Sequence, residues 1–154
     1  MDTNRFAPPK ADVEGAHIEA IAAPALWNPN AAANWCLLFT PIFGTWLHMK
    51  NWTALQDNER ANAARMWLIA SIVVVTGVIL LSLRPHGVQV PRSINFVLLI
   101  AWYFAGARGQ VKYVKERFGD DYPRRSWGQP LLLALGAIVL YIVVVTALVF
   151  NGIV

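Results

Sequence analysis

The chain has 154 residues, of which 56% are hydrophobic and 14% are charged. Soluble domains usually carry about 25% charged residues, so this composition argues against a soluble enzyme domain and favours a membrane protein. The length allows one domain and is too short for a transporter built from two inverted repeats. A single cysteine, Cys36, excludes an internal disulfide and any CxxC metal or redox motif.

The net charge is +4, and the basic residues lie in the short stretches between the apolar runs. The positive-inside rule and anionic lipid headgroups would produce this distribution. We therefore expect membrane lipids, and not nucleic acid, to be the partners of these residues.

Residues 1–30 form a polar tail that contains several Pro and Ala residues. The tail lacks the basic start and apolar core of a secretory signal peptide. One short helix is compatible with 14–23, and the rest is expected to be extended. Residues 31–154 are expected to form a single transmembrane helical domain.

Two runs, 66–83 and 130–150, hold 18 and 21 residues without a charge. Eighteen helical residues extend about 27 Å, close to the thickness of the hydrocarbon layer. We expect both runs to cross a membrane. Asp57 is placed to cap the first helix, which would then run from about residue 58 to residue 83.

The run 93–107 has only 15 residues between Arg92 and Arg108. Snorkelling arginines can lengthen such a run, so we expect a third crossing here. Beyond it the helix is expected to continue through residues 109–119. Arg108, Lys112 and Lys115 would then share one face of an amphipathic extension at the level of the headgroups.

The run 31–49 is apolar and long enough to cross, but Pro41 and Gly44 interrupt it. It is either a crossing helix kinked at Pro41 or a re-entrant or interfacial segment. Hydrophobicity favours the first alternative. We therefore expect an all-α integral membrane bundle of four transmembrane helices, with three as the close alternative.

Charge predicts the orientation in the membrane. Residues 108–129 should be cytoplasmic, and residues 84–92 and the C-terminus should face outward. With four crossings nine Lys and Arg residues lie inside and four outside, whereas with three crossings the counts are eleven and two. Charge therefore slightly favours three crossings, and the side of the N-terminus depends on the first run. The basic residues that set this topology, or face lipid, are Arg108, Lys112, Lys115, Arg117, Arg124 and Arg125.

Polar residues inside apolar runs are candidates for function. Here they are Asn34, Thr45 and His48, and hydrogen bonds between helices are the simpler interpretation. Two stripes are candidates for helix packing or partner contact: the aromatic set Trp35, Phe39, Phe43 and Trp46, and the small set Ala101, Ala105 and Gly109. For the aromatic stripe we favour packing.

No catalytic or metal-binding motif is found in the sequence. His17, His48 and His86 are too widely spaced for a local metal motif, and Asp120-Asp121 lies in a turn beside basic residues. We therefore expect a protein that is not an enzyme and that has no catalytic residues, metal ligands or cofactor.

Three stretches, NRFAPPKADVEG, WNPNAAANWCLLFTPIFGTWLHMKNW and VKYVKERFGDDYPRRSWGQPLL, resemble a group of small proteobacterial inner-membrane proteins. Small polytopic proteins of this kind include immunity proteins against toxins delivered by type VI secretion. By size and topology, the resemblance implies a protein partner in the inner membrane and immunity against a membrane-inserting, pore-forming toxin. The alternatives are an accessory subunit or assembly factor of a larger complex, and a small oligomeric transporter or channel.

Overall fold

The computed structural model describes residues 23–83, 91 and 93–152. The short helix considered at 14–23 lies outside this part of the chain except for Ala23. The elements of the described residues are helical, apart from one isolated bridge between Leu26 and Arg124. In chain order they are α1 (Pro29–Phe39), α2 (Pro41–Ala54), α3 (Asn58–Ser82), α4 (Ser93–Trp102), the π-helical turn η2 (Tyr103–Ala107), α5 (Arg108–Phe118) and α6 (Gly128–Phe150).

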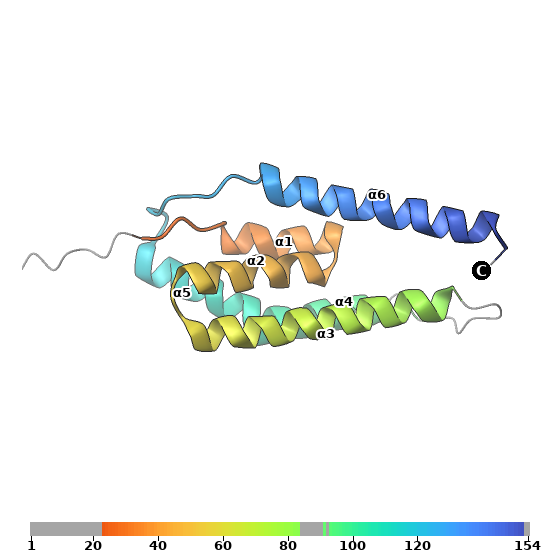
Figure 1. Ribbon diagram of the computed structural model, residues 1–154. Coiled ribbons are helices and arrows are strands. Elements are labelled where there is room, and N and C mark those ends of the chain that lie inside the picture. Colours follow the sequence, from red (N-terminus) through yellow and green to blue (C-terminus); the bar gives the residue numbers. More distant parts are fainter. Residues whose placement is uncertain (1–22, 84–90, 92, 153–154) are drawn as a thin grey trace, which may run out of the picture.

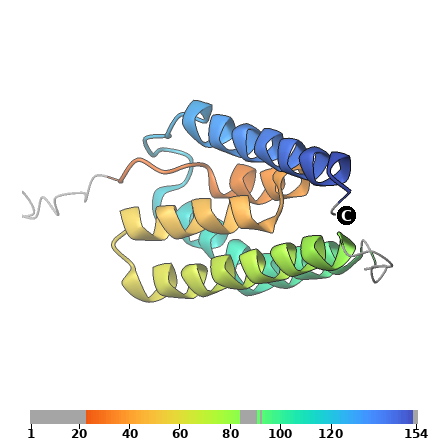
Figure 2. The ribbon, with the colours of Figure 1, turned by 45° about the vertical axis from the view of Figure 1, so that its right-hand side comes forward.

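The first apolar run folds back on itself as a helical hairpin of α1 and α2 (Figures 1 and 2). The 11 residues of α1 and the 14 of α2 extend about 16 Å and 21 Å. Neither is long enough for the roughly 30 Å of a hydrocarbon layer. The expected single helix with a kink at Pro41 is therefore replaced by a full reversal at Thr40.

The reversal follows from the local sequence. Pro41 has no backbone N–H, and its ring keeps the preceding residue out of the helical conformation. Thr40 accordingly takes φ 117° and ψ 159°, and Pro41 becomes the first residue of α2. Gly44 then allows the two helices to meet, because a Cβ at this position would overlap the Cys36 Sγ.

Helices α3 and α6 confirm that the runs 66–83 and 130–150 form long apolar helices. Asp57 caps α3 by accepting a hydrogen bond from the Arg60 N–H at 3.0 Å, as expected. Both helices are long and apolar enough to cross a membrane. Within their most apolar 18 residues, only 11% of the residues of α3 and none of α6 are buried inside the molecule.

The run 93–107 continues into the basic segment as one helical rod, which confirms the expected extension. α4, η2 and α5 follow one another without a break from Ser93 to Phe118. A π-helical turn carries an extra residue, so it rotates the faces on its two sides relative to each other. The side chain of Trp102, just before this turn, is buried against the hairpin near Cys36 and Ala33.

The segment before α1 is fixed to the loop before α6. The Leu26 N–H donates to the Pro123 carbonyl at 2.9 Å, and the Arg125 N–H donates to the Leu26 carbonyl at 2.9 Å. Figure 1 shows that four helix ends lie at one end of the molecule: the start of α1, the end of α2, the start of α3 and the end of α5. The far ends of α3 and α6 extend beyond the tip of the hairpin at the other end.

Candidate functional site

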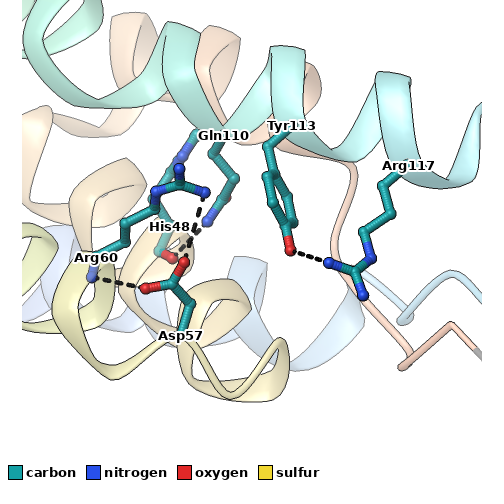
Figure 3. Close-up of polar contacts among 6 residues, drawn as sticks. All are labelled: His48, Asp57, Arg60, Gln110, Tyr113 and Arg117. Atoms are coloured by element: carbon teal, nitrogen blue, oxygen red, sulfur yellow. Dashed lines mark hydrogen bonds and ion pairs between the residues drawn. The ribbon is translucent and has the colours of Figure 1, made fainter. Parts of the chain in front are cut away.

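A buried polar cluster joins the hairpin to α5. The Asn51 Oδ1 accepts from the Trp27 N–H at 3.0 Å, and its Nδ2 donates to the Trp27 carbonyl at 2.8 Å and to the Gln110 Oε1 at 3.2 Å. The Gln110 Nε2 in turn donates to the His48 carbonyl at 2.9 Å (Figure 3). Asn51, Gln110 and His48 are at most 2% exposed. A satisfied buried network of this kind fixes the relative positions of the segments that it joins.

His48 has one ring nitrogen bonded and one free. Its Nε2 lies 3.1 Å from the Pro29 carbonyl oxygen, which can only accept. Nε2 therefore carries the hydrogen, and in the neutral ring Nδ1 is an acceptor. This Nδ1 is buried and has no partner among the described residues. The ring also packs edge-on against Trp102, with the centroids 5.2 Å apart.

A cavity of about 200 Å³ lies beside His48, between α2, α3 and the helical rod of α4, η2 and α5. Three indole rings contribute to its wall, and the rod contributes small residues from within and just after the π-helical turn. The lining comprises His48, Trp52, Arg60, Ala63, Ala64, Trp67, Trp102, Ala105, Gly106 and Gly109. Engineered cavities of about 150 Å³ bind benzene, so this one has room for a substituted ring.

Among the described residues that line this cavity, Arg60 is the one that carries a charge, and it has an acidic neighbour. Its Nη1 lies 3.4 Å from the Asp57 Oδ2 (Figure 3). Its guanidinium carbon lies 4.9 Å from the ring centroids of both Trp52 and Tyr113, within the range of cation–π attraction. The Tyr113 hydroxyl accepts a hydrogen bond from the Arg117 Nη1 at 2.8 Å. The Tyr113 ring that contacts Arg60 is therefore also bonded to a residue near the end of α5.

A second hollow, the lateral groove, has a volume of about 420 Å³ and lies between the hairpin tip, α3 and α6. Its lining is apolar except for the Thr40 and Tyr141 side chains. From the hairpin it includes Phe39, Phe43 and Trp46, from α3 Ile79, and from α6 Ala137 and Tyr141.

The structure does not bring the three polar candidates together. Asn34 is exposed on α1. The Thr45 hydroxyl is buried and donates within its own helix, 2.9 Å from the Pro41 carbonyl oxygen and 3.0 Å from that of Ile42. His48 faces the polar cluster and the cavity. Within the described part of the chain, only the His48 ring bonds to another helix, at the Pro29 carbonyl of α1, so the interpretation as hydrogen bonds between helices holds for this residue and not for the other two.

The aromatic stripe wraps around the hairpin, because its members belong to two antiparallel helices. Trp35 and Phe39 are 5.5 Å apart between ring centroids, Phe39 and Phe43 are 5.1 Å apart, and Phe43 and Trp46 are 6.4 Å apart. Trp35 also lies 6.2 Å from Trp127, at the entry to α6. These contacts place the stripe in packing against the start of α6.

Ala101, Ala105 and Gly109 do not serve close helix packing within the described part of the chain. All three are exposed, and a Cβ added at Gly109 would meet no atom within 4 Å. The extra residue of the π-helical turn also shifts Gly109 away from the line through Ala101 and Ala105. Two of the three instead border the cavity beside His48.

The six basic residues of 108–129 lie along α5 and in the segment that connects α5 to α6. All are exposed except Arg125, which is half-buried with its guanidinium carbon 4.7 Å from the Trp27 ring centroid. Lys112 pairs with Glu116 and Arg124 with Asp120, each at 3.7 Å. Exposed pairs of this kind contribute little to stability.

The sequence pattern does not single out Asn51, Gln110, Trp27 or Trp102 as site residues. Asn51 and Gln110 are polar residues beside basic ones, which is where solvent-facing side chains are normally expected. The one local signal that could identify Asn51 is its three-residue spacing from His48, which places both residues on one face of a helix.

Neither a protein-family model, nor a curated protein, nor a solved structure matches this chain. The functional argument therefore depends on the geometry of the cluster, the cavity and the groove.

Proposed function

We propose that this chain is a non-enzymatic protein of the bacterial inner membrane that binds a partner protein inside the bilayer. The partner that we propose is a membrane-inserting, pore-forming toxin delivered by type VI secretion, against which the chain confers immunity. The observation that carries the proposal is the exposure of α6, an apolar helix of 23 residues in whose most apolar 18 residues none is buried.

Membrane embedding is supported by where the apolar surface lies. The core helix of a soluble protein is mostly buried, whereas α3 and α6 present apolar side chains outward along their length. Monomeric soluble proteins rarely expose contiguous apolar patches of more than a few hundred Å². Hydrocarbon satisfies such a surface, and the helical backbone bonds internally, as lipid requires.

The hairpin supports three crossings with a re-entrant segment. The segment before α1 and the start of α3 lie at the same end of the molecule, so the hairpin enters and leaves on one side. Crossings by α3, by the rod of α4, η2 and α5, and by α6 would then place the nine Lys and Arg residues of the described part of the chain on that side. By the positive-inside rule it is the cytoplasm, with the C-terminus in the periplasm.

The lateral groove is the contact surface that we assign to the partner. In lipid, helices associate through close van der Waals packing, because lipid tails are as apolar as the side chains. The groove offers aromatic walls from the hairpin on one side and small residues of α6, such as Ala134 and Ala137, on the other. An apolar transmembrane helix of an inserted toxin could pack there without leaving a polar group unpaired.

The test is competition between a deletion strain and its parent, with contact-dependent secretion active and then blocked. We expect the deletion strain to be killed only when the parent can secrete, and plasmid-borne wild-type protein to restore survival. Equal survival in both conditions would overturn immunity.

A matched pair of variants tests the groove. Ala137→Trp fills the groove from α6, whereas Ala147→Trp adds the same volume to the same helix outside it. We expect Ala137→Trp to lose protection and Ala147→Trp to keep it, at equal membrane levels. Protection by both variants would remove the groove from the mechanism.

A subunit or assembly factor of a larger complex would use the same exposed helices and would have a phenotype without any toxin. Recovery of a constitutive complex in mild detergent, together with survival in competition, would favour that function. An oligomeric channel is less well supported, because Asn34, Thr45 and His48 do not line one path.

A further inference from the structure

We propose that segment 11–22 of this chain folds back over a hollow at the end of α5 and places a carboxylate against Arg117. The hollow has a volume of about 210 Å³ and lies between the end of α2, the turn before α3 and the end of α5. It shares no lining residue with the lateral groove, so the proposal is independent of the proposed immunity function. The lining comprises Pro24, Ala54, Leu55, Gln56, Tyr113, Arg117 and Phe118.

The first support is the place where the segment joins the described part of the chain. Pro24 borders the hollow. Two residues further on, Leu26 is bonded through its N–H and its carbonyl to the loop before α6, so the position of this junction is fixed. A short segment attached at the rim of a site has a roughly millimolar effective concentration there, so weak contacts are enough to hold it.

The second support is the environment of Arg117. Its Nη1 donates to the Tyr113 hydroxyl at 2.8 Å, and its guanidinium carbon lies 5.8 Å from the ring centroids of Tyr113 and Phe118 (Figure 3). Both of these rings also line the hollow, and the Arg117 side chain is exposed. The ion pairs among the described residues do not include Arg117. A guanidinium has five N–H donors and no acceptor, so a carboxylate matches the donors that remain.

The third support is the charge of the segment. Residues 11–22 contain three carboxylates, Asp12, Glu14 and Glu19, and no Lys or Arg. The described residues carry nine Lys and Arg against five Asp and Glu, so the body of the molecule has the opposite sign. Opposite charges favour the encounter of the segment with the end of α5 over its release.

Glu19 is the carboxylate that we assign to Arg117. It stands five residues before Pro24, and five residues extend at most about 17 Å, which exceeds the width of a hollow of this volume. Ile21 then brings an aliphatic side chain to the apolar part of the lining. An anionic lipid headgroup is the competing occupant, and the covalent attachment at Pro24 favours the segment.

The test measures how fast a glutamate-specific protease cleaves the full chain after Glu14 and Glu19 in nanodiscs of phosphatidylcholine. Cleavage follows the population of the open form when opening and closing are fast. We expect Arg117→Gln, which removes the charge, to be cleaved about threefold faster than the wild type, as suits the loss of one exposed ion pair. Arg117→Lys keeps the charge and should be cleaved nearly as slowly as the wild type.

Arg124→Gln is the matched control, because Arg124 is also exposed and lies outside the hollow. None of these changes alters the cleaved segment, and melting temperatures check that each variant is folded. We expect Arg124→Gln to be cleaved at the wild-type rate. Equal acceleration by Arg117→Gln and Arg124→Gln would show a response to overall charge alone and would overturn the proposal. Equal rates for folded Arg117→Gln and the wild type would overturn it as well.

Nanodiscs that contain phosphatidylglycerol test the competing occupant. We expect the wild type to be cleaved as slowly in these anionic discs as in phosphatidylcholine. Cleavage as fast as that of Arg117→Gln would assign the hollow to a lipid headgroup and overturn the proposal. No toxin enters these measurements, so their failure leaves the competition result intact.

Discussion

The side chain of Asn51 forms hydrogen bonds with both backbone groups of Trp27, at 3.0 Å from the N–H and 2.8 Å from the carbonyl. The Asn51 amide thus bonds to the N–H and the carbonyl of Trp27 in the way that a neighbouring β-strand would. Its second Nδ2 hydrogen reaches Gln110 on α5, 59 positions away in the sequence. One buried side chain therefore joins the segment before α1, the end of α2 and the helical rod.

Replacement of Asn51 by leucine keeps a similar volume and removes all three hydrogen bonds. A buried polar group left unpaired costs about 1–3 kcal/mol, so we expect the free energy of unfolding to fall by about 3 kcal/mol or more. Denaturant titration in mild detergent measures this loss. Asn34→Leu, on the exposed face of α1, is the control and should change stability by less than about 0.5 kcal/mol. Equal losses would show that the cluster does not stabilise the fold.

Gly44→Ala should be destabilising, because its Cβ would overlap Cys36 and lie 3.0 Å from the Ala32 carbonyl oxygen and from the Trp102 ring. Overpacking of this kind costs about 1–3 kcal/mol. Gly77→Ala in α3 meets open space and should cause no loss. The measurement is the free energy of unfolding in detergent of the wild-type protein and of the two variants.

Addition of Cys36→Ala to Gly44→Ala should recover part of the stability, since it removes the atom with the worst overlap. The measure is the coupling energy of the double-mutant cycle. Strict additivity of the two changes would contradict the close approach of α1 and α2 at this point.

The long helices could be predicted from the sequence because charge and apolar length alone determine them. The cap at Asp57 and the continuation of 93–107 into a basic helix are likewise local properties, and the structure confirms them. The path of 31–49 could not be decided in this way. Pro41 predicts an interruption of the helix. Whether the chain bends or reverses there depends on whether another helix packs closely against Gly44, which a local pattern does not tell.

The cluster and the cavity escaped sequence analysis for a related reason. Gln110 lies between the basic residues Arg108 and Lys112. A helix here would be expected at the depth of the lipid headgroups, where water or headgroups can form hydrogen bonds with the Gln110 amide. It is buried only because Asn51 and the His48 carbonyl approach from a hairpin that the sequence did not define. The π-helical turn that shapes the cavity has no signature in residue type, so its effect on the Ala101–Gly109 stripe could not be expected.

Thr40→Gly should stabilise the hairpin. A β-branched residue at φ 117° and ψ 159° occupies a region used almost only by glycine, at a cost of about 1–3 kcal/mol. Glycine removes this strain and loses roughly 0.5–1 kcal/mol through greater freedom of the unfolded chain. A net gain of about 1 kcal/mol should appear in denaturant unfolding. Thr53→Gly, within the regular helix α2, should instead be destabilising, and a loss in both variants would contradict the reversal at Thr40.

The re-entrant hairpin predicts that the residues before α1 and after α2 lie on the same side of the membrane. In a Cys36→Ser background, single cysteines at Ala25 and Asn58 should both be protected from a membrane-impermeant maleimide in intact spheroplasts. Both should react once the membrane is opened. A cysteine at Asn151, at the end of α6, should react without opening, because the proposed three crossings would place it on the periplasmic side. A straight first crossing would give opposite results at Ala25 and Asn58. That pattern would restore four crossings, and the hairpin would have to be abandoned as the structure in the membrane.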